Sequence, residues 1–242
     1  MKKQPSGFTL VELAIVMTII GLLITGVLRG QELVHNARVT SLIEQTDAYK
    51  AAVRTFQDIY SGVPGDLANA SVRVANCNAA NFCLSGDGSS IVGAAYTGAQ
   101  TASDVSGAQE NVQFWKHLAL ANLIAGVSGS GNPATPDWSV TFPSTRIGGG
   151  FQVMELNDTI DNSFGLYLRL QNQVVGALPA TTSGVHPLSP IRARQIDVKI
   201  DDGISNSGDV TGEFQNSGCD DANGEYTNNS SDNCILLFKL DG

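Results

Sequence analysis

The side chains of this sequence that could take part in catalysis do not show the spacing of a recognisable catalytic centre. Its three histidines, His35, His117 and His186, lie far apart and form no HExxH metal-binding motif. No lysine belongs to a glycine-rich phosphate-binding loop, and the Ser, Asp and Glu residues form no recognisable catalytic motif. We therefore predict that the protein is not an enzyme. We predict His117 to be a core or rim residue rather than a ligand.

Acidic residues gather in two stretches of the C-terminal third. Asp201, Asp202 and Asp209 form the first, and the second contains Asp220, Asp221, Asn223 and Glu225. Carboxylate oxygens suit calcium, but neither stretch has the spacing of an EF-hand loop. We expect solvated turns and a helix cap here, and no cofactor. Calcium bound by Asp201, Asp202 and Asp209 is the alternative.

The four cysteines are Cys77, Cys83, Cys219 and Cys234. Zinc is disfavoured because the CxxC spacing is missing and the histidines are distant in sequence. Four cysteines allow three disulfide connectivities, and sequence proximity favours Cys77–Cys83 and Cys219–Cys234. The second bridge would close a polar loop that has few core residues of its own, which is worth about 3 kcal/mol.

One carboxylate, Glu12, lies inside an apolar segment. It is the only charged residue in positions 8–28, and a charge at the centre of a membrane helix costs about 3 kcal/mol. As a helix this segment spans about 31 Å, close to the thickness of a bilayer core. Lys2 and Lys3 precede it, so the N-terminus should stay cytoplasmic.

A secretory signal peptide and a plain signal anchor fit the N-terminal segment less well. A signal peptide would have a shorter apolar region and a small-residue cleavage site, whereas Arg29 and Gly30 follow Leu28 here. A plain signal anchor accounts for the two lysines and the apolar run, but it does not account for Glu12 unless that side chain snorkels towards the interface.

Residues Gly7-Phe8-Thr9-Leu10-Val11-Glu12-Leu13 resemble the processing site of type IV prepilins and type II secretion pseudopilins. The resemblance implies that prepilin peptidase removes leader residues 1–7 by cutting between Gly7 and Phe8, and that Phe8 is then N-methylated. It also implies that Glu12 acts in assembly, by pairing with the Phe8 amine of a neighbouring subunit. The best-attested use of a buried ion pair of this kind is to fix the register of one helix along its neighbours.

The same resemblance implies partners and a location. The partners are prepilin peptidase, an inner-membrane assembly platform and other pilin or pseudopilin subunits. The protein would cross the inner membrane once with a periplasmic head, and then enter a periplasmic or extracellular filament. The sequence does not separate a pilus subunit from two alternatives, a type II secretion pseudopilin and a minor tip subunit that acts as a binding module.

The helical pattern continues beyond the membrane segment. Over residues 29–60 apolar groups recur at steps of three and four, and the sequence Ser61-Gly62-Val63-Pro64-Gly65 ends the pattern. We therefore predict one helix over residues 8–60, whose second half is amphipathic. Arg29 stands near a position where many pilins carry proline, which favours a pseudopilin or minor subunit.

Residues 61–242 are predicted to form the globular head, with a fold of the α+β class. We expect a mostly buried helix over residues 109–125, a helix over 191–200 after Ser189-Pro190, and an antiparallel sheet. The predicted strands are 139–142, 151–156, 164–170, 173–178 and 234–240. The head has 8 basic and 18 acidic residues, within a net charge of −9 for the chain, which argues against nucleic-acid binding.

Overall fold

The computed structural model describes residues 9–93, 110–132, 137–158, 163–172, 174, 186–212, 218–221 and 223–240. The chain divides into two compact units, residues 1–41 and 42–242. The first unit holds the apolar part of a long helix. The second holds the rest of that helix and all other elements, and is called the head unit below.

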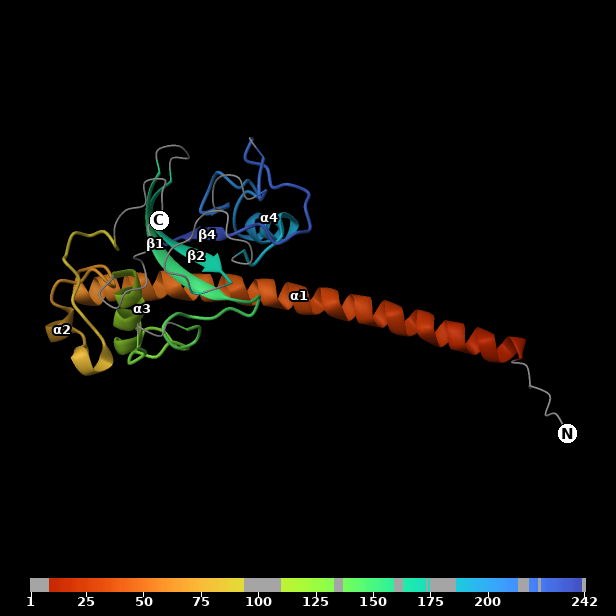
Figure 1. The fold of residues 1–242 in the computed structure, drawn as a ribbon, viewed down its shortest axis with the longest axis horizontal. Coiled ribbons are helices and arrows are strands. Elements are labelled where there is room, and N and C mark those ends of the chain that lie inside the picture. Colours follow the sequence, from red (N-terminus) through yellow and green to blue (C-terminus); the bar gives the residue numbers. More distant parts are fainter. Residues whose placement is uncertain are drawn as a thin grey trace. The chain divides into compact units, whose positions relative to one another are not determined.

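The first element is the predicted long helix, α1, which runs from Leu10 to Tyr60 without interruption (Figure 1). No proline lies within it, so no residue beyond the first turn lacks the backbone N–H that the helix requires. Ser61 then takes a left-handed conformation, with φ of 49°, and Pro64 follows shortly after. The helix therefore ends where the sequence predicted.

The C-terminal half of α1 supplies one wall of the head core. Its buried residues recur every three or four positions, which places them on one face of the helix. The Tyr49 ring packs edge-on against Trp115, at 5.1 Å between centroids, and against Phe151, at 5.9 Å. Phe56 stacks on His117. The buried residues of this face are Leu42, Thr46, Tyr49, Ala52, Val53 and Phe56.

The sheet of the head unit contains β1 (Gly150–Asp158), β2 (Ser163–Gln171), β3 (Val210–Gly212) and β4 (Leu236–Lys239). Its strand order is β1-β2-β4-β3, and all three pairings are antiparallel. Phe151, Leu168 and Phe238 are fully buried and belong to three different strands. The structure thus confirms an α+β, pilin-like arrangement.

Three short or medium helices complete the described head, together with one 3₁₀ turn. These are α2 (Ala70–Arg73), the 3₁₀ turn η1 (Ala79–Asn81), α3 (Glu110–Leu120) and α4 (Pro190–Ile200). Figure 1 shows α3 and α4 at opposite ends of the sheet. This agrees with their contacts, because α3 contacts β1 and α4 contacts β3, the two edge strands.

Helix α3 is shorter than predicted. We expected it to continue to residue 125, but it ends at Leu120 because Asn122 takes a left-handed conformation, with φ of 57°. The Leu123 N–H then donates to the Leu118 carbonyl, and the Asn122 N–H donates to Ala119. This is a Schellman cap with asparagine in the position that glycine usually holds.

The strand prediction needs two corrections. Residues 139–142 form a turn, because Ser139 has a φ of 63° and its N–H donates to the Phe142 carbonyl. Strand β3 was not predicted, since three residues are too few to show an alternating pattern. The predicted strand at 173–178 lies outside the described residues except for position 174, which belongs to no strand.

Helix α4 resolves an ambiguous sequence in favour of helix. Ile196, Val198 and Ile200 alternate as in a strand, but Pro190 starts the helix in the first turn, where its missing N–H costs nothing. The predicted cap at Ser189 forms without a side-chain hydrogen bond. At the other end Gly203 has a φ of 79°, as a residue after a helix often does.

Both disulfides that sequence proximity favoured are present. Cys77 is bonded to Cys83, and Cys219 is bonded to Cys234. All four cysteines are buried. The second bridge joins the start of a polar loop to Cys234, two residues before β4, so it ties this loop to the edge of the core.

Candidate functional site

The described chain begins at Thr9, where α1 is capped. The Thr9 N–H donates to Glu12 Oε2 at 2.9 Å, and the Thr9 hydroxyl donates to the same oxygen at 2.8 Å. In return, the Glu12 N–H donates to Thr9 Oγ1 at 3.3 Å. These reciprocal contacts form a capping box, and the signal for it was present in the sequence as Thr-x-x-Glu at positions 9–12.

Glu12 therefore also caps the N-terminus of α1, a function that we did not predict from the sequence. The carboxylate satisfies a backbone donor at the start of the helix and lies near the positive end of the helix dipole. Gly7 and Phe8, the predicted processing residues, lie outside the described residues. The structure therefore positions Glu12 at the helix start, while its pairing with the Phe8 amine stays a prediction.

The surroundings of Glu12 are apolar. Every residue from Leu10 to Leu28 has an exposed side chain, and Leu10 and Leu22 are 85% and 76% exposed. Helix α1 is the one helix of the described residues that is long and apolar enough to cross a membrane. So large an exposed apolar surface requires a lipid or protein environment.

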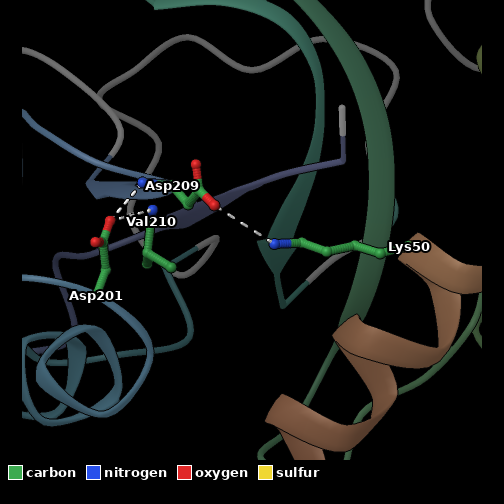
Figure 2. Close-up of polar contacts among 4 residues, drawn as sticks. All are labelled: Lys50, Asp201, Asp209 and Val210. Atoms are coloured by element: carbon green, nitrogen blue, oxygen red, sulfur yellow. Dashed lines mark hydrogen bonds and ion pairs between the residues drawn. The ribbon is translucent and has the colours of Figure 1, made fainter. Parts of the chain in front are cut away.

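The three calcium candidates do not converge on one point. The Asp201 carboxylate accepts hydrogen bonds from the backbone N–H groups of Asp209 and Val210 (Figure 2). The Asp209 carboxylate turns instead towards Lys50, at 4.0 Å. Asp202 accepts from the Ile204 N–H at 2.8 Å and from the Ser207 hydroxyl at 2.6 Å.

Asp197, a residue that the sequence did not single out, joins Asp201 and Asp202. Its side chain is fully buried, and it accepts hydrogen bonds from the Tyr226 hydroxyl, at 2.9 Å, and the Gly203 N–H, at 3.2 Å. Burial raises the pKa of Asp197 to about 6. These carboxylates hold together the turn that follows α4, as the predicted helix cap would.

We expect chelation to leave the melting temperature of the full-length protein unchanged. The carboxylates of Asp201 and Asp202 already accept hydrogen bonds from the turn, so we expect the turn to fold without a cation. The measurement is thermal unfolding with EGTA and with excess calcium at equal ionic strength. A calcium-dependent rise would contradict this, because a ligand that binds the folded state stabilises it by mass action.

A second acidic group holds a loop against α3. The buried Asp66 carboxylate accepts the backbone N–H groups of Gly88, Ser89 and Ser90, at 2.6 to 3.1 Å. Glu110 accepts those of Asp87 and Gly93, each at 2.9 Å. No sequence motif marked these contacts, because they join residues more than 15 positions apart.

Two polar side chains of α3 are buried in the head. His117 Nδ1 accepts the Gly65 N–H at 2.8 Å, and its Nε2 lies 2.8 Å from the Leu84 carbonyl. This confirms the predicted core histidine. The Lys116 ammonium donates to the carbonyls of Asn81, Gly129 and Gly131. Both side chains are thus bound to backbone groups and act in packing.

The fold and the capped apolar helix together describe a pilin-like protein. Residues 2–28 match the prokaryotic N-terminal methylation motif. This motif is the signature of type IV pilins and pseudopilins, and it supports that assignment for the chain. The comparisons with curated proteins and with solved structures give no significant match.

Proposed function

We propose that the chain is a structural subunit of a type IV pilus or a related filament. Prepilin peptidase cuts it between Gly7 and Phe8 and methylates Phe8, and the subunit polymerises through α1. The observation that carries this proposal is the capped glutamate, Glu12, at the start of a membrane-length apolar helix within the matched motif. A structural subunit needs no catalytic residues, in agreement with the sequence.

Before assembly the subunit crosses the inner membrane once. Lys2 and Lys3 hold the N-terminus in the cytoplasm, so the head unit lies in the periplasm. Two disulfides in the head suit this oxidising compartment. After assembly the apolar surface of α1 is covered by the same surface of neighbouring subunits instead of by lipid. The assembly platform in the membrane is the partner that drives this transfer.

We expect the mature protein to begin with N-methylated Phe8. Mass spectrometry of the N-terminal peptide from cells with an active prepilin peptidase measures this directly. The same cells without the peptidase are the control, and there the protein should keep residues 1–7. An intact Met1–Gly7 segment on most of the protein in peptidase-positive cells would refute the proposed processing.

A pseudopilin or minor subunit is a second candidate, and the continuity of α1 favours it. The helix passes through Arg29 without a break, at the place where many pilins carry proline. Sheared filaments distinguish the candidates. A major pilin dominates the sheared fraction, a minor pilin is present at a low proportion, and a pseudopilin stays with the cell envelope.

A further inference from the structure

The buried disulfide between Cys77 and Cys83 lies beside His117. The two sulfur atoms and a ring nitrogen of the histidine all lie within 4.8 Å of one another, and all three side chains are buried. The histidines are distant from the cysteines in sequence, but the fold brings this one to them from α3. Two cysteine sulfurs and an imidazole nitrogen are ligands that zinc prefers in proteins.

In the oxidised protein the two sulfur atoms are bonded to each other. Cysteine binds a metal ion only as a free thiolate, so the intact bridge excludes a metal from this place. A zinc site here therefore belongs to the reduced protein. It can form only if the segment that carries both cysteines, residues 77–84, stays beside His117 after the bridge is cleaved. This segment is called the cysteine loop below.

Helix α3 holds the cysteine loop by contacts that do not involve the bridge. The Gln113 side-chain amide donates to the Phe82 carbonyl at 3.1 Å and accepts the Leu84 N–H at 2.9 Å. The Lys116 ammonium donates to the Asn81 carbonyl at 3.1 Å. These hydrogen bonds use backbone groups of the loop and leave the sulfur atoms free. We therefore expect the loop to remain on α3 when the bridge is reduced.

The hydrogen bonds of His117 select the tautomer that a metal ligand requires. Its Nδ1 accepts the Gly65 N–H at 2.8 Å, so the ring proton is on Nε2, which donates to the Leu84 carbonyl at 2.8 Å. Histidine ligands commonly donate their second ring N–H to a backbone carbonyl in this way. The lone pair of Nδ1 can thus turn to a metal ion at the loss of one hydrogen bond.

The second bridge, Cys219–Cys234, offers no comparable set of ligands. Within the described part of the chain, neither of its cysteines belongs to a group of three His, Cys, Asp or Glu side chains that could hold a metal ion. Both of these cysteines are buried, like those of the first bridge. They are therefore an internal control for any metal binding that follows from reduced cysteines alone.

We propose that the reduced head binds one zinc ion through Cys77, Cys83 and His117. A dithiol first reduces the bridge by thiol–disulfide exchange: it transfers two electrons and two protons to the cysteines and itself becomes a disulfide. The two thiols then bind Zn²⁺ as thiolates and release two protons. Three protein ligands leave one position of tetrahedral zinc for water. The bridge and the zinc ion are thus alternative cross-links that hold the cysteine loop, and the zinc ion also joins it to α3.

Alkylation of the reduced full-length protein tests this site. The protein is reduced with a phosphine in detergent, and mass spectrometry measures how fast iodoacetamide modifies each cysteine with and without Zn²⁺. We expect zinc to slow the modification of Cys77 and Cys83 about tenfold or more, and that of Cys219 and Cys234 less than about twofold. Equal slowing at all four cysteines would mean that a reduced, unfolded chain binds the metal. That result, or no slowing at Cys77 and Cys83, would overturn the proposal.

A histidine variant tests the third ligand. Competition with a chromogenic chelator measures the zinc affinity of the reduced protein. We expect His117→Gln to lower this affinity about tenfold or more, and His35→Gln, the matched control, to change it less than about twofold. Equal affinities for His117→Gln and wild type would overturn the role of the histidine.

A cysteine variant separates ligand loss from loss of packing. His117→Gln also removes the ring that stacks on Phe56, whereas Cys83→Ser keeps that ring in place. We expect Cys83→Ser to abolish the protection of Cys77 by zinc. Persistent protection of Cys77 in this variant would contradict a shared site. None of these measurements depends on whether the protein enters filaments.

Discussion

Glu12→Leu should remain in the membrane and enter filaments at least tenfold less than wild type. The substitution leaves Gly7 and Phe8 unchanged, so cleavage should continue. In the filament, however, the Phe8 amine would lose its carboxylate partner inside an apolar bundle. An unpaired charge in such a place costs several kcal/mol, and about 1.4 kcal/mol already corresponds to a factor of ten.

A second variant is needed to separate the two roles of Glu12, because Glu12→Leu removes both the negative charge and the helix cap. Glu12→Gln removes only the charge, since glutamine at this position can still accept the Thr9 N–H. If Glu12 serves only as a cap, the glutamine variant should assemble normally. If it pairs with the Phe8 amine, both variants should fail. We expect both to fail.

The measurement is the ratio of protein in sheared filaments to protein in the membrane pool. Glu32→Leu is the matched control, because Glu32 is an exposed residue of the same helix, 3.0 Å from Arg29. It should assemble as wild type does. Each variant should be expressed beside wild-type copies, because a terminal subunit lacks one neighbour. Normal incorporation of Glu12→Leu would show that Glu12 does not determine register.

The second large effect concerns acid stability and His117. We expect its side chain to destabilise the folded protein by up to about 3 kcal/mol as the pH falls from 7 to 4. Burial lowers the pKa of His117 to about 4, against an ordinary value of 6.5. Between pH 6.5 and pH 4, His117 is mostly protonated in the unfolded chain and mostly neutral in the folded chain. The stability contribution is therefore complete above pH 6.5 and is lost towards pH 4.

The hydrogen bonds of the His117 ring explain why the folded protein favours the neutral imidazole. In the neutral form Nε2–H donates to the Leu84 carbonyl, while Nδ1 accepts the Gly65 N–H. Protonation would place a second N–H against the Gly65 donor and a charge in the core. The neutral tautomer thus satisfies both neighbours, and the imidazolium does not.

Denaturant unfolding of full-length His117→Gln and wild type across pH 7 to 4 measures this effect. The variant should be less stable at pH 7, because it loses the ring packing on Phe56, yet its stability should fall less towards pH 4. Asp197 titrates with the opposite sign, since its pKa is raised, but it is common to both proteins. His35→Gln is the matched control. Parallel pH profiles for wild type and His117→Gln would contradict the prediction.

Local patterns in the sequence explain why much of the molecule was predictable. The apolar run and the absence of proline act over neighbouring residues along α1. The same is true of Ser189-Pro190 at the start of α4 and of the close pair Cys77–Cys83. Each depends on chain geometry over one or two turns, which a sequence displays directly.

Other features depend on residues that the fold brings together from distant positions. Tyr226 donates a hydrogen bond to the buried Asp197 from 29 positions further along the chain, and Asp66 accepts hydrogen bonds from a loop more than 20 positions away. Asp209 turns to Lys50 rather than to Asp201 as a metal ligand would. No spacing rule predicts such contacts, because they follow from how the sheet and α1 close around the core.

The sequence by itself determined the N-terminal helix, the α+β class and the pilin-type motif, because local periodicity and spacing encode them. It allowed three disulfide connectivities and favoured one by proximity, and the tertiary structure decided that this one forms. Only the tertiary structure decided which charges are satisfied within the head and which remain free. It bonded the carboxylates of Asp66 and Glu110, beside α3, to backbone N–H groups, and it left the cations of α4, at the opposite edge of the same sheet, without an ion pair among the described residues. That separation depends on strand order, which arises from long-range pairing and leaves no local pattern in the chain.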